Sequence, residues 1–151
     1  MKQRLINDNL SRALHQRLYE RMRTFCRKYT PEFPADTVVS TWLNRLYSGD
    51  DTIHILVVLD DNYNIVGHVV VTVYKDHGYT IVHCHQAQAD KGHTGSIDEF
   101  MEYIDKLVSI SNAYCSVMTV TKHTKGLEKK YGYKQSRVTM IKVNDQSENN
   151  I

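Results

Sequence analysis

Cysteine is scarce in this sequence, and its three occurrences follow no recognisable ligand pattern. Cys26, Cys84 and Cys115 are odd in number and widely spaced, with no CxxC pair and no Cys/His ladder. This arrangement argues against a disulfide framework and against a structural zinc site. We therefore expect a reducing compartment and predict no metal.

Long apolar runs and a strong net charge are lacking as well. No stretch of about 18 apolar residues occurs, and the first sixteen residues, MKQRLINDNLSRALHQ, contain no apolar signal core. The net charge is only +2, which is too small to indicate nucleic acid or an anionic membrane as a partner. The expectation is a soluble, cytoplasmic protein with no membrane association.

What remains is an ordinary globular composition. The chain has 151 residues, of which 41% are hydrophobic and 24% charged, enough to bury a core without metal or disulfide support. No internal repeat is present. We predict a single domain over residues 1–143, followed by a polar tail over residues 144–151 with the sequence NDQSENNI.

The first third of the chain has helical periodicity. Asn7, Asp8 and Asn9 offer N-caps for a first helix, which Pro31 and Pro34 end. A second helix is predicted from about Asp36 to the Ser48-Gly49 turn. The apolar residues at spacings of three and four are Leu10, Ala13, Leu14, Leu18, Met22 and Phe25 in the first helix, and Val39, Trp42, Leu43 and Leu46 in the second.

The rest of the chain alternates strands with helices. β-Branched runs separated by turn residues predict strands, and a short strand at Lys2–Ile6 is an option. The predicted order is (β)ααβββαβαβ, with strands over Ile53–Leu59, Ile65–Tyr74, Tyr79–Gln86, Tyr114–Val120 and Tyr133–Val143, a helix that Ser96 caps, and a helix over His123–Tyr131.

Three segments in this order carry a family resemblance. They are DNYNIVGH (61–68), QAQADKGHTG (86–95) and LEKKYGY (127–133). Together they resemble the GNAT acetyltransferases, whose second motif is a glycine-containing loop between a strand and a helix and whose third contains L-Y-E-K-x-G-F/Y. The separation from Gly95 to Gly132 is 37 residues (132 − 95), similar to that of the family.

The resemblance implies an α/β fold with a mixed, twisted sheet of about five to seven strands and helices on both sides. In that family the sheet separates between the fourth and fifth strands, and acetyl-CoA, the co-substrate, lies in the gap. A glycine loop at a helix N-terminus suits a pyrophosphate, because its backbone N–H groups and the helix dipole favour an anion. The residues implied in cofactor binding are Ala87, Gln88, Lys91, Gly92, His93, Thr94, Gly95 and Ser96.

The sequence departs from the family pattern at two positions. Asp90 falls where the family has Gln or Arg facing the pyrophosphate, and Glu128 falls where the family has a tyrosine that commonly protonates the leaving thiolate. The glycines Gly92 and Gly95 also lie three residues apart rather than two. Acyl transfer to an amine acceptor is the implied activity, with these changes bearing on cofactor binding and on the acid.

His85 and Glu128 are the candidate catalytic residues. His83 and His85 share one strand face by the period of two, and His85, nearer the loop, is the candidate base. Glu128 can act as the acid only if burial raises its pKa. Two other interpretations stay open: a solvated sheet face for the histidines, or a metal pair completed by His54 and His68. Cys84 points to the opposite face and is predicted to be core.

A non-catalytic alternative stays open too. A divergent GNAT-like protein can serve as a structural or partner-binding component, for example in a bacteriophage virion or in host interaction, with a protein partner or a second copy of itself. The first helix also carries a basic face, which a nucleic acid could contact, although a solvated helix face is favoured because Glu20 interrupts it. That face consists of Arg12, Arg17, Arg21, Arg23, Arg27 and Lys28.

Overall fold

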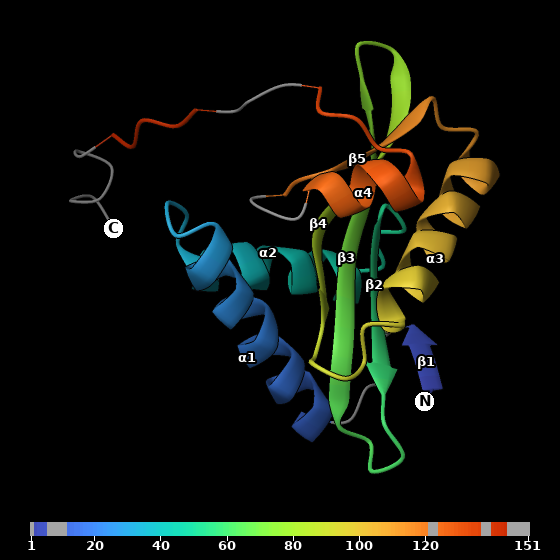
Figure 1. The fold of residues 1–151 in the computed structure, drawn as a ribbon. Helices are drawn as coiled ribbons and strands as arrows, with labels where there is room; N and C mark the ends of the chain where they lie inside the picture. The colour runs from blue at the N-terminus through green and yellow to red at the C-terminus, as the bar shows by residue number, and fades with distance from the viewer. Residues whose placement is uncertain (1, 6–11, 121–123, 137–139, 145–151) are drawn as a thin grey trace.

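A computed structural model describes residues 2–5, 12–120, 124–136 and 140–144 of the chain (Figure 1). The predicted caps at Asn7–Asn9, the first stripe residue Leu10 and most of the polar tail lie outside these residues. The elements are β1 (Lys2–Leu5), α1 (Arg12–Tyr29), α2 (Ala35–Tyr47), β2 (Ile53–Leu59), β3 (Ile65–Asp76), β4 (Tyr79–Ala89), α3 (Ser96–Ser111), β5 (Cys115–Met118) and α4 (Thr124–Tyr131).

The strands form one mixed sheet in the order β1-β2-β3-β4-β5. The first four strands pair antiparallel, whereas β5 pairs parallel to β4 after the crossover through α3. This confirms the predicted mixed α/β fold, at the lower end of the expected strand count. The optional first strand is present and pairs with β2.

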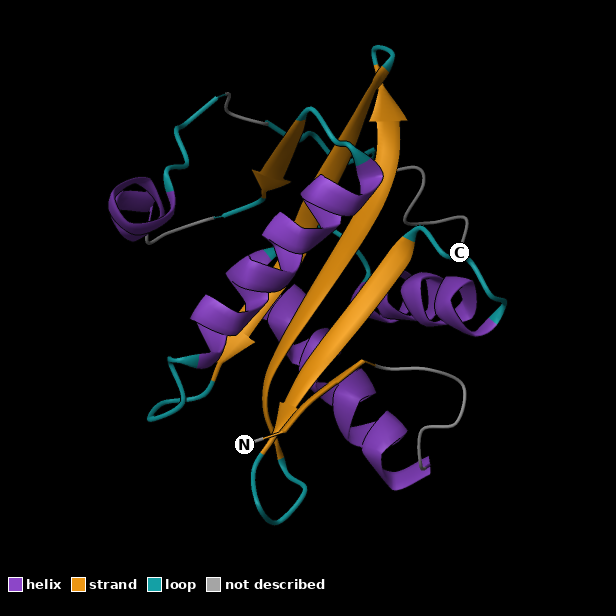
Figure 2. Cartoon of the chain, turned by 90° about the vertical axis from the view of Figure 1, so that its right-hand side faces the viewer, coloured by secondary structure: helices purple, strands orange, loops and turns teal. Residues whose placement is uncertain are grey.

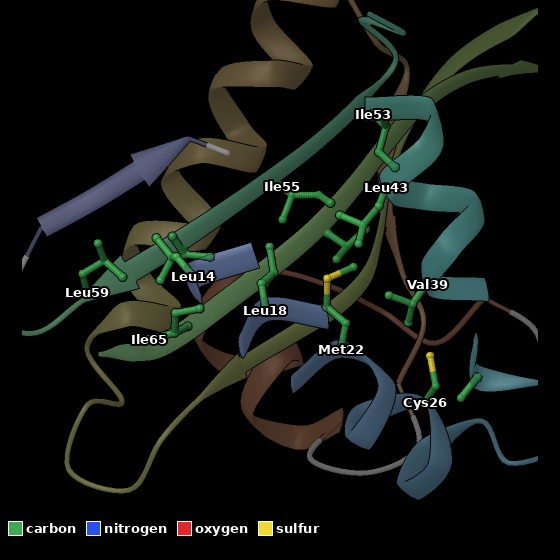
Figure 3. Close-up of a cluster of buried hydrophobic side chains, with 13 residues drawn as sticks. Leu14, Leu18, Met22, Cys26, Val39, Leu43, Ile53, Ile55, Leu59 and Ile65 are labelled. Atoms are coloured by element: carbon green, nitrogen blue, oxygen red, sulfur yellow. The ribbon is translucent and has the colours of Figure 1, made fainter. Parts of the chain in front are cut away.

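Helices cover both faces of the sheet. Figure 2 shows α3 lying along one face of the strands, with α1 and α2 behind the sheet. The core between the sheet and α1 and α2 is built from alternate side chains of β2 and from the apolar stripes of the two helices (Figure 3). Its buried members include Leu18, Met22, Cys26, Val39, Leu43, Ile53, Ile55 and Val57.

The opposite core packs α3 against the sheet. The predicted stripe of α3 is confirmed by its buried residues, which are Phe100, Met101, Ile104 and Leu107. Gly67, the glycine of the first family-like segment, lies under this helix. A Cβ at Gly67 would meet the Phe100 ring at 3.2 Å and the Gln88 carbonyl oxygen at 3.3 Å, so glycine lets the start of α3 approach β3 closely.

The start of α3 differs from the prediction. Gly95 occupies the N-cap position and supplies no side-chain cap, while Ser96 is the first helical residue and is fully buried. The predicted Ser96 cap is therefore wrong. The Ser96 backbone N–H instead donates to the His93 carbonyl at 3.0 Å, which closes the turn that leads into the helix.

The predicted last strand is also wrong over the described residues of 133–143. These residues form no strand. The Tyr133 hydroxyl stays at the sheet, 2.9 Å from that of Ser116 of β5, and Figure 1 shows the later described residues of the segment running away from the sheet. Met140 is 90% exposed, and Ile141 and Val143 are also exposed. A strand needs a partner that satisfies its backbone, and β5, only four residues long, offers a short edge. Apolar content alone did not decide the conformation.

Among the described helices, none has the length and apolar character that a bilayer crossing requires.

Candidate functional site

The site begins where β4 and β5 separate. The parallel pairing joins Ile81–Cys84 to Cys115–Met118, and one further contact, from the Thr119 N–H to the Cys84 carbonyl at 3.2 Å, ends it. β4 continues to Ala89 beyond this point. One edge of β4 is consequently open over its last residues, in the part of the sheet that the structure describes.

A β-bulge marks the point of separation. Val71 of β3 pairs with Cys84, but the next residue, Val70, pairs with Gln86, so His85 is an extra residue in β4. A bulge bends its strand and increases the local twist. It also keeps the His85 and Gln86 side chains on the same face, because His85 contacts Trp42 of α2 and Gln86 contacts Met22 of α1. The bulge therefore turns the end of β4 away from β5.

The open edge presents two backbone N–H groups. Along a strand, N–H groups alternate between the two edges. The Asp90 N–H donates to the Val66 carbonyl of β3 at 2.8 Å, so the N–H groups of Ala87 and Ala89 point to the other edge. Both alanines line a cavity there. The edge therefore offers two donors to an extended ligand.

The cavity has a volume of about 520 Å³ and lies between the end of β4, the segment after β5, and three helices. Its walls come from segments far apart in sequence. The lining residues are Phe25, Tyr29 and Thr30 of α1 and its end; Cys84, His85, Ala87, Gln88 and Ala89 of β4; Thr94, Ile97 and Met101 at the start of α3; Met118, Thr119 and Val120; and Gly126, Leu127, Lys130 and Tyr131 of α4.

The loop between β4 and α3 closes as a compact turn. The His93 N–H donates to the Asp90 carbonyl at 2.9 Å, and Gly92 has φ +87°, a conformation that favours glycine. Gly95 has ordinary helical angles, and a Cβ built on it meets nothing within 4 Å. Gly92 thus shapes the loop, whereas Gly95 leaves open space above the N-terminus of α3.

Arg21 of α1 forms an ion pair with Asp90 in the loop after β4. Its guanidinium lies 2.7 Å from the Asp90 carboxylate, with the Arg21 side chain 14% exposed and the Asp90 side chain 44% exposed. The acidic residue beside the loop is therefore neutralised. The prediction that Arg21 lies on the basic outer face of α1 is therefore wrong. Arg23 of the same set pairs with Glu20 and Asp36.

The same arginine belongs to a buried polar network beneath the bulge. The Arg21 Nε–H donates to His68 Nδ1 at 2.9 Å, so the remaining ring proton of a neutral His68 lies on Nε2 and is donated to Gln86 Oε1, also at 2.9 Å. Gln86 in turn donates to the Met22 carbonyl at 3.3 Å. Burial is the main cause that lowers the pKa of His68 to about 4. The network ties α1 to the bulged part of β4.

The predicted histidine pair is confirmed as a shared face. The rings of His83 and His85 stack with centroids 4.0 Å apart. His85 Nε2 lies 2.7 Å from the Thr72 hydroxyl, and His83 Nε2 lies 2.7 Å from that of Thr119. Burial, followed by the neighbouring His83 and Arg45, lowers the pKa of His85 to about 3. His85 is therefore neutral and lines the cavity.

The structure does not support Glu128 as the acid. Glu128 is exposed on α4 and is not among the cavity-lining residues, whereas Tyr131 lines the cavity. The Tyr131 hydroxyl donates to the Asp98 carboxylate, and burial first and Asp98 second raise its pKa above the usual 10.0. Lys130, also in the lining, pairs with Asp98 at 2.9 Å. Tyr131 therefore lines the cavity as a protonated phenol whose hydroxyl is bonded to Asp98.

The structure brings some predicted cofactor residues together and not others. Ala87, Gln88 and Thr94 line the cavity, along with His85. Ser96 is removed from the set, because its side chain is fully buried and its N–H is used within the loop. The remaining predicted residues lie in the adjoining loop without lining the cavity: Lys91, Gly92, His93 and Gly95.

Sequence reasoning missed most of the walls contributed by helices. Leu127, Lys130 and Tyr131 share one face of α4 by their spacing of three and four, as do Phe25 and Tyr29 on α1. This spacing was a usable signal, but it does not say which helix faces β4. The metal alternative fails on position, since His54 bonds Tyr103 of α3 on the other face of the sheet. No group of three metal-ligating side chains occurs among the described residues.

Known proteins resemble this chain in structure rather than in sequence. No protein-family model matches the sequence, and no curated protein matches it. A probable acetyltransferase superposes with a TM-score of 0.70 at 8% identity, covering 96% of this chain and 99% of the other. Glucosamine-6-phosphate N-acetyltransferase from Arabidopsis thaliana gives 0.67 at 13%, covering 96% and 100%. Ribosomal-protein-alanine N-acetyltransferase from Brucella melitensis biovar Abortus 2308 gives 0.63 at 13%, covering 95% and 100%.

Proposed function

We propose that this chain, which has the GNAT acetyltransferase fold, is an N-acetyltransferase that transfers the acetyl group of acetyl-CoA to an amine. The observation that carries the proposal is the cavity at the separation of β4 and β5, with the open backbone edge of β4 in its wall. The similar structures named above are acetyltransferases with different acceptors, so the likeness supports the fold and the reaction class, and the acceptor has to come from this chain's own residues.

The cavity walls suit the parts of acetyl-CoA. The Ala89 N–H can pair with an amide of the pantetheine arm, in the way that an added strand pairs with a sheet edge, and the Ala87 N–H remains for the thioester carbonyl. The loop before α3 and the dipole at the helix N-terminus favour the pyrophosphate, while Lys130 lines the wall as an ion pair with Asp98. The ion pair between Arg21 and Asp90 removes the charge conflict that the sequence suggested.

The transfer itself needs three groups besides the two substrates. In this proposal the amine nitrogen attacks the thioester carbonyl carbon, and the Ala87 N–H stabilises the negative oxygen of the tetrahedral intermediate. The C–S bond then breaks, giving the amide and the CoA thiolate. In this proposal His85 accepts the proton that the nitrogen loses, and the Tyr131 hydroxyl turns from Asp98 and protonates the thiolate. Positioning supplies much of the rate, so a weak base suffices for turnover.

The first test is binding of CoA to the full chain. A ligand at 100 times its Kd stabilises the folded state by about 2.7 kcal/mol, so CoA and acetyl-CoA should raise the melting temperature. Gly95→Glu should remove the shift, because its side chain fills the open space at the N-terminus of α3. Gly95→Ala, whose Cβ meets no neighbour, and Arg17→Ala on the exposed side of α1 are the matched controls and should keep it.

The outcomes separate the interpretations. A folded protein whose melting temperature is unchanged by either ligand would refute the proposal. Equal loss of CoA binding in Gly95→Ala and Gly95→Glu would mean that the substitutions act by changing the loop conformation rather than by blocking access to the N-terminus of α3. Binding without release of CoA thiol across a panel of amines would support the non-catalytic, partner-binding alternative.

A further inference from the structure

The half of the cavity that remains for the amine has aromatic and apolar walls. Acetyl-CoA occupies the loop and α4 side in the proposed function, on which this inference rests, and His85 faces the α1 and α2 side of the sheet. The amine therefore meets the residues from α1 and from the end of β5. Phe25 and Tyr29 lie one turn apart with ring centroids 4.6 Å apart, and Met118 and Val120 line the same cavity.

Charge in this cavity disfavours a cationic acceptor. None of the described lining residues is a carboxylate, and the only lining residue with a formal charge among them is Lys130, whose ammonium already pairs with Asp98 on the α4 side of the cavity. Lys28 places a positive charge on the α1 side, with its ammonium 5.2 Å from the centroid of the Tyr29 ring. An ammonium group moved from water into such a site loses hydration without gaining a partner of opposite charge.

Proton handling leads to the same substrate class. His83 and His85 stack at 4.0 Å, so a proton on one ring opposes a proton on the other. The pair is thus poorly equipped to deprotonate an ammonium ion before attack. It can accept a proton from a nitrogen that has already attacked, because the N–H groups of the intermediate are much more acidic than those of the free amine.

We infer that the acceptor is a weakly basic aromatic amine, whose amino group is uncharged at neutral pH and whose ring packs against Phe25 and Tyr29. Aromatic rings at centroid distances of 4.5–7 Å gain about 0.5–1.5 kcal/mol beyond the burial of their area. Polycationic amines are excluded by the same walls, since they would bring several unpaired charges into the cavity.

Two isomeric amines test this inference at constant composition. 4-Methylaniline and benzylamine have the same formula and one ring each, but only benzylamine is protonated at pH 7. With the full chain and saturating acetyl-CoA, thiol release should show kcat/KM for 4-methylaniline at least about tenfold above that for benzylamine, the factor equivalent to one binding increment of 1.4 kcal/mol. Spermidine, a polycation, should give no release above the background.

A charge-insertion variant gives an independent reading. Val120→Asp puts a carboxylate in the lining and should move the ratio of the two isomers toward benzylamine. Val143→Asp, at a valine exposed to the same degree (40% against 39%) and outside the cavity, should leave the ratio unchanged. An unchanged ratio in Val120→Asp, or a wild-type preference for benzylamine or spermidine, would overturn the inference.

The two levels of failure are distinguishable. If acetyl-CoA raises the melting temperature but neither isomer is acetylated, the additional thermal shift produced by each isomer on the CoA complex decides the inference, and a larger shift with benzylamine refutes it. If acetyl-CoA does not change the melting temperature, the proposed function is refuted, and the inference about the acceptor is refuted with it.

Discussion

Replacing Arg21 by methionine should destabilise the fold more than its place on a polar helix suggests. Methionine keeps the apolar stem but removes three interactions of the guanidinium: with His68 Nδ1 at 2.9 Å, with the Ile65 carbonyl at 3.2 Å, and with the Asp90 carboxylate at 2.7 Å. His68 is fully buried, so its acceptor nitrogen is left without a donor, which costs about 1–3 kcal/mol.

The Asp90 side of the interaction contributes less. Its side chain is 44% exposed, so water can replace the arginine, and the loss is that of a surface pair, up to about 1 kcal/mol. The expected sum for Arg21→Met is about 1–4 kcal/mol of unfolding free energy, or roughly 2–16 °C in Tm for a chain of this size. Asp90→Asn, which removes only the surface part, should cost about 1 kcal/mol or less.

Urea unfolding followed by circular dichroism measures both variants, and CoA titration supplies a second readout. Arg21→Met should also weaken CoA binding, because it leaves an unpaired Asp90 carboxylate beside the loop. The double variant with Asp90→Asn should recover the CoA affinity but not the stability. Two results would refute the claim that the buried bond between Arg21 and His68 stabilises the fold. One is a loss of stability in Asp90→Asn as large as that in Arg21→Met, and the other is a loss in Arg21→Met below about 0.5 kcal/mol, as for an ordinary surface change.

Two further predictions concern protonation and the acid. Burial lowers the pKa of His68 to about 4 and that of His85 to about 3, against the usual 6.5, so the unfolded chain takes up protons that the folded chain excludes. The unfolding free energy should be fully developed above pH 6.5 and fall as the pH is lowered toward 4. Urea titrations at several pH values measure this, and His85→Gln should make the unfolding free energy depend less steeply on pH. An unfolding free energy that stays constant over that range contradicts the prediction. Tyr131→Phe should lower kcat about 10²-fold, in the range typical of general acids, with little change in CoA affinity. Glu128→Gln, at an exposed position, should leave thiol release unchanged. A larger loss of thiol release in Glu128→Gln than in Tyr131→Phe would restore Glu128 as the acid.

The order of elements could be predicted because it depends on short-range patterns. The apolar spacing of three and four in α3 and the β-branched runs of β2 and β3 determine which face of each element is buried. The glycine-containing loop between β4 and α3 was found for the same reason, since Gly92 adopts φ +87° and belongs to a local turn. These features require no knowledge of distant residues.

Side-chain roles were not decided locally. Arg17 and Arg21 stand one helical turn apart and appear equivalent in the sequence, yet Arg21 lies against β3 and β4 and pairs with Asp90. Glu128 and Tyr131 are three residues apart on α4, and the way that α4 packs places only Tyr131 at the cavity. The bulge at His85 also has no sequence signal of its own, because it depends on the pairing of β4 with β3.

The sequence by itself determined a mixed α/β chain with a glycine loop at a helix start and a histidine pair on one strand face, because periodicity and turn chemistry act over a few residues. Only the tertiary structure decided that β5 parts from β4 after Cys84, that Asp90 is neutralised, and that the described residues after Gly132 form no strand although Tyr133 contacts β5. Each of these outcomes depends on which distant groups meet, and that is set by packing across the whole domain rather than by any local pattern.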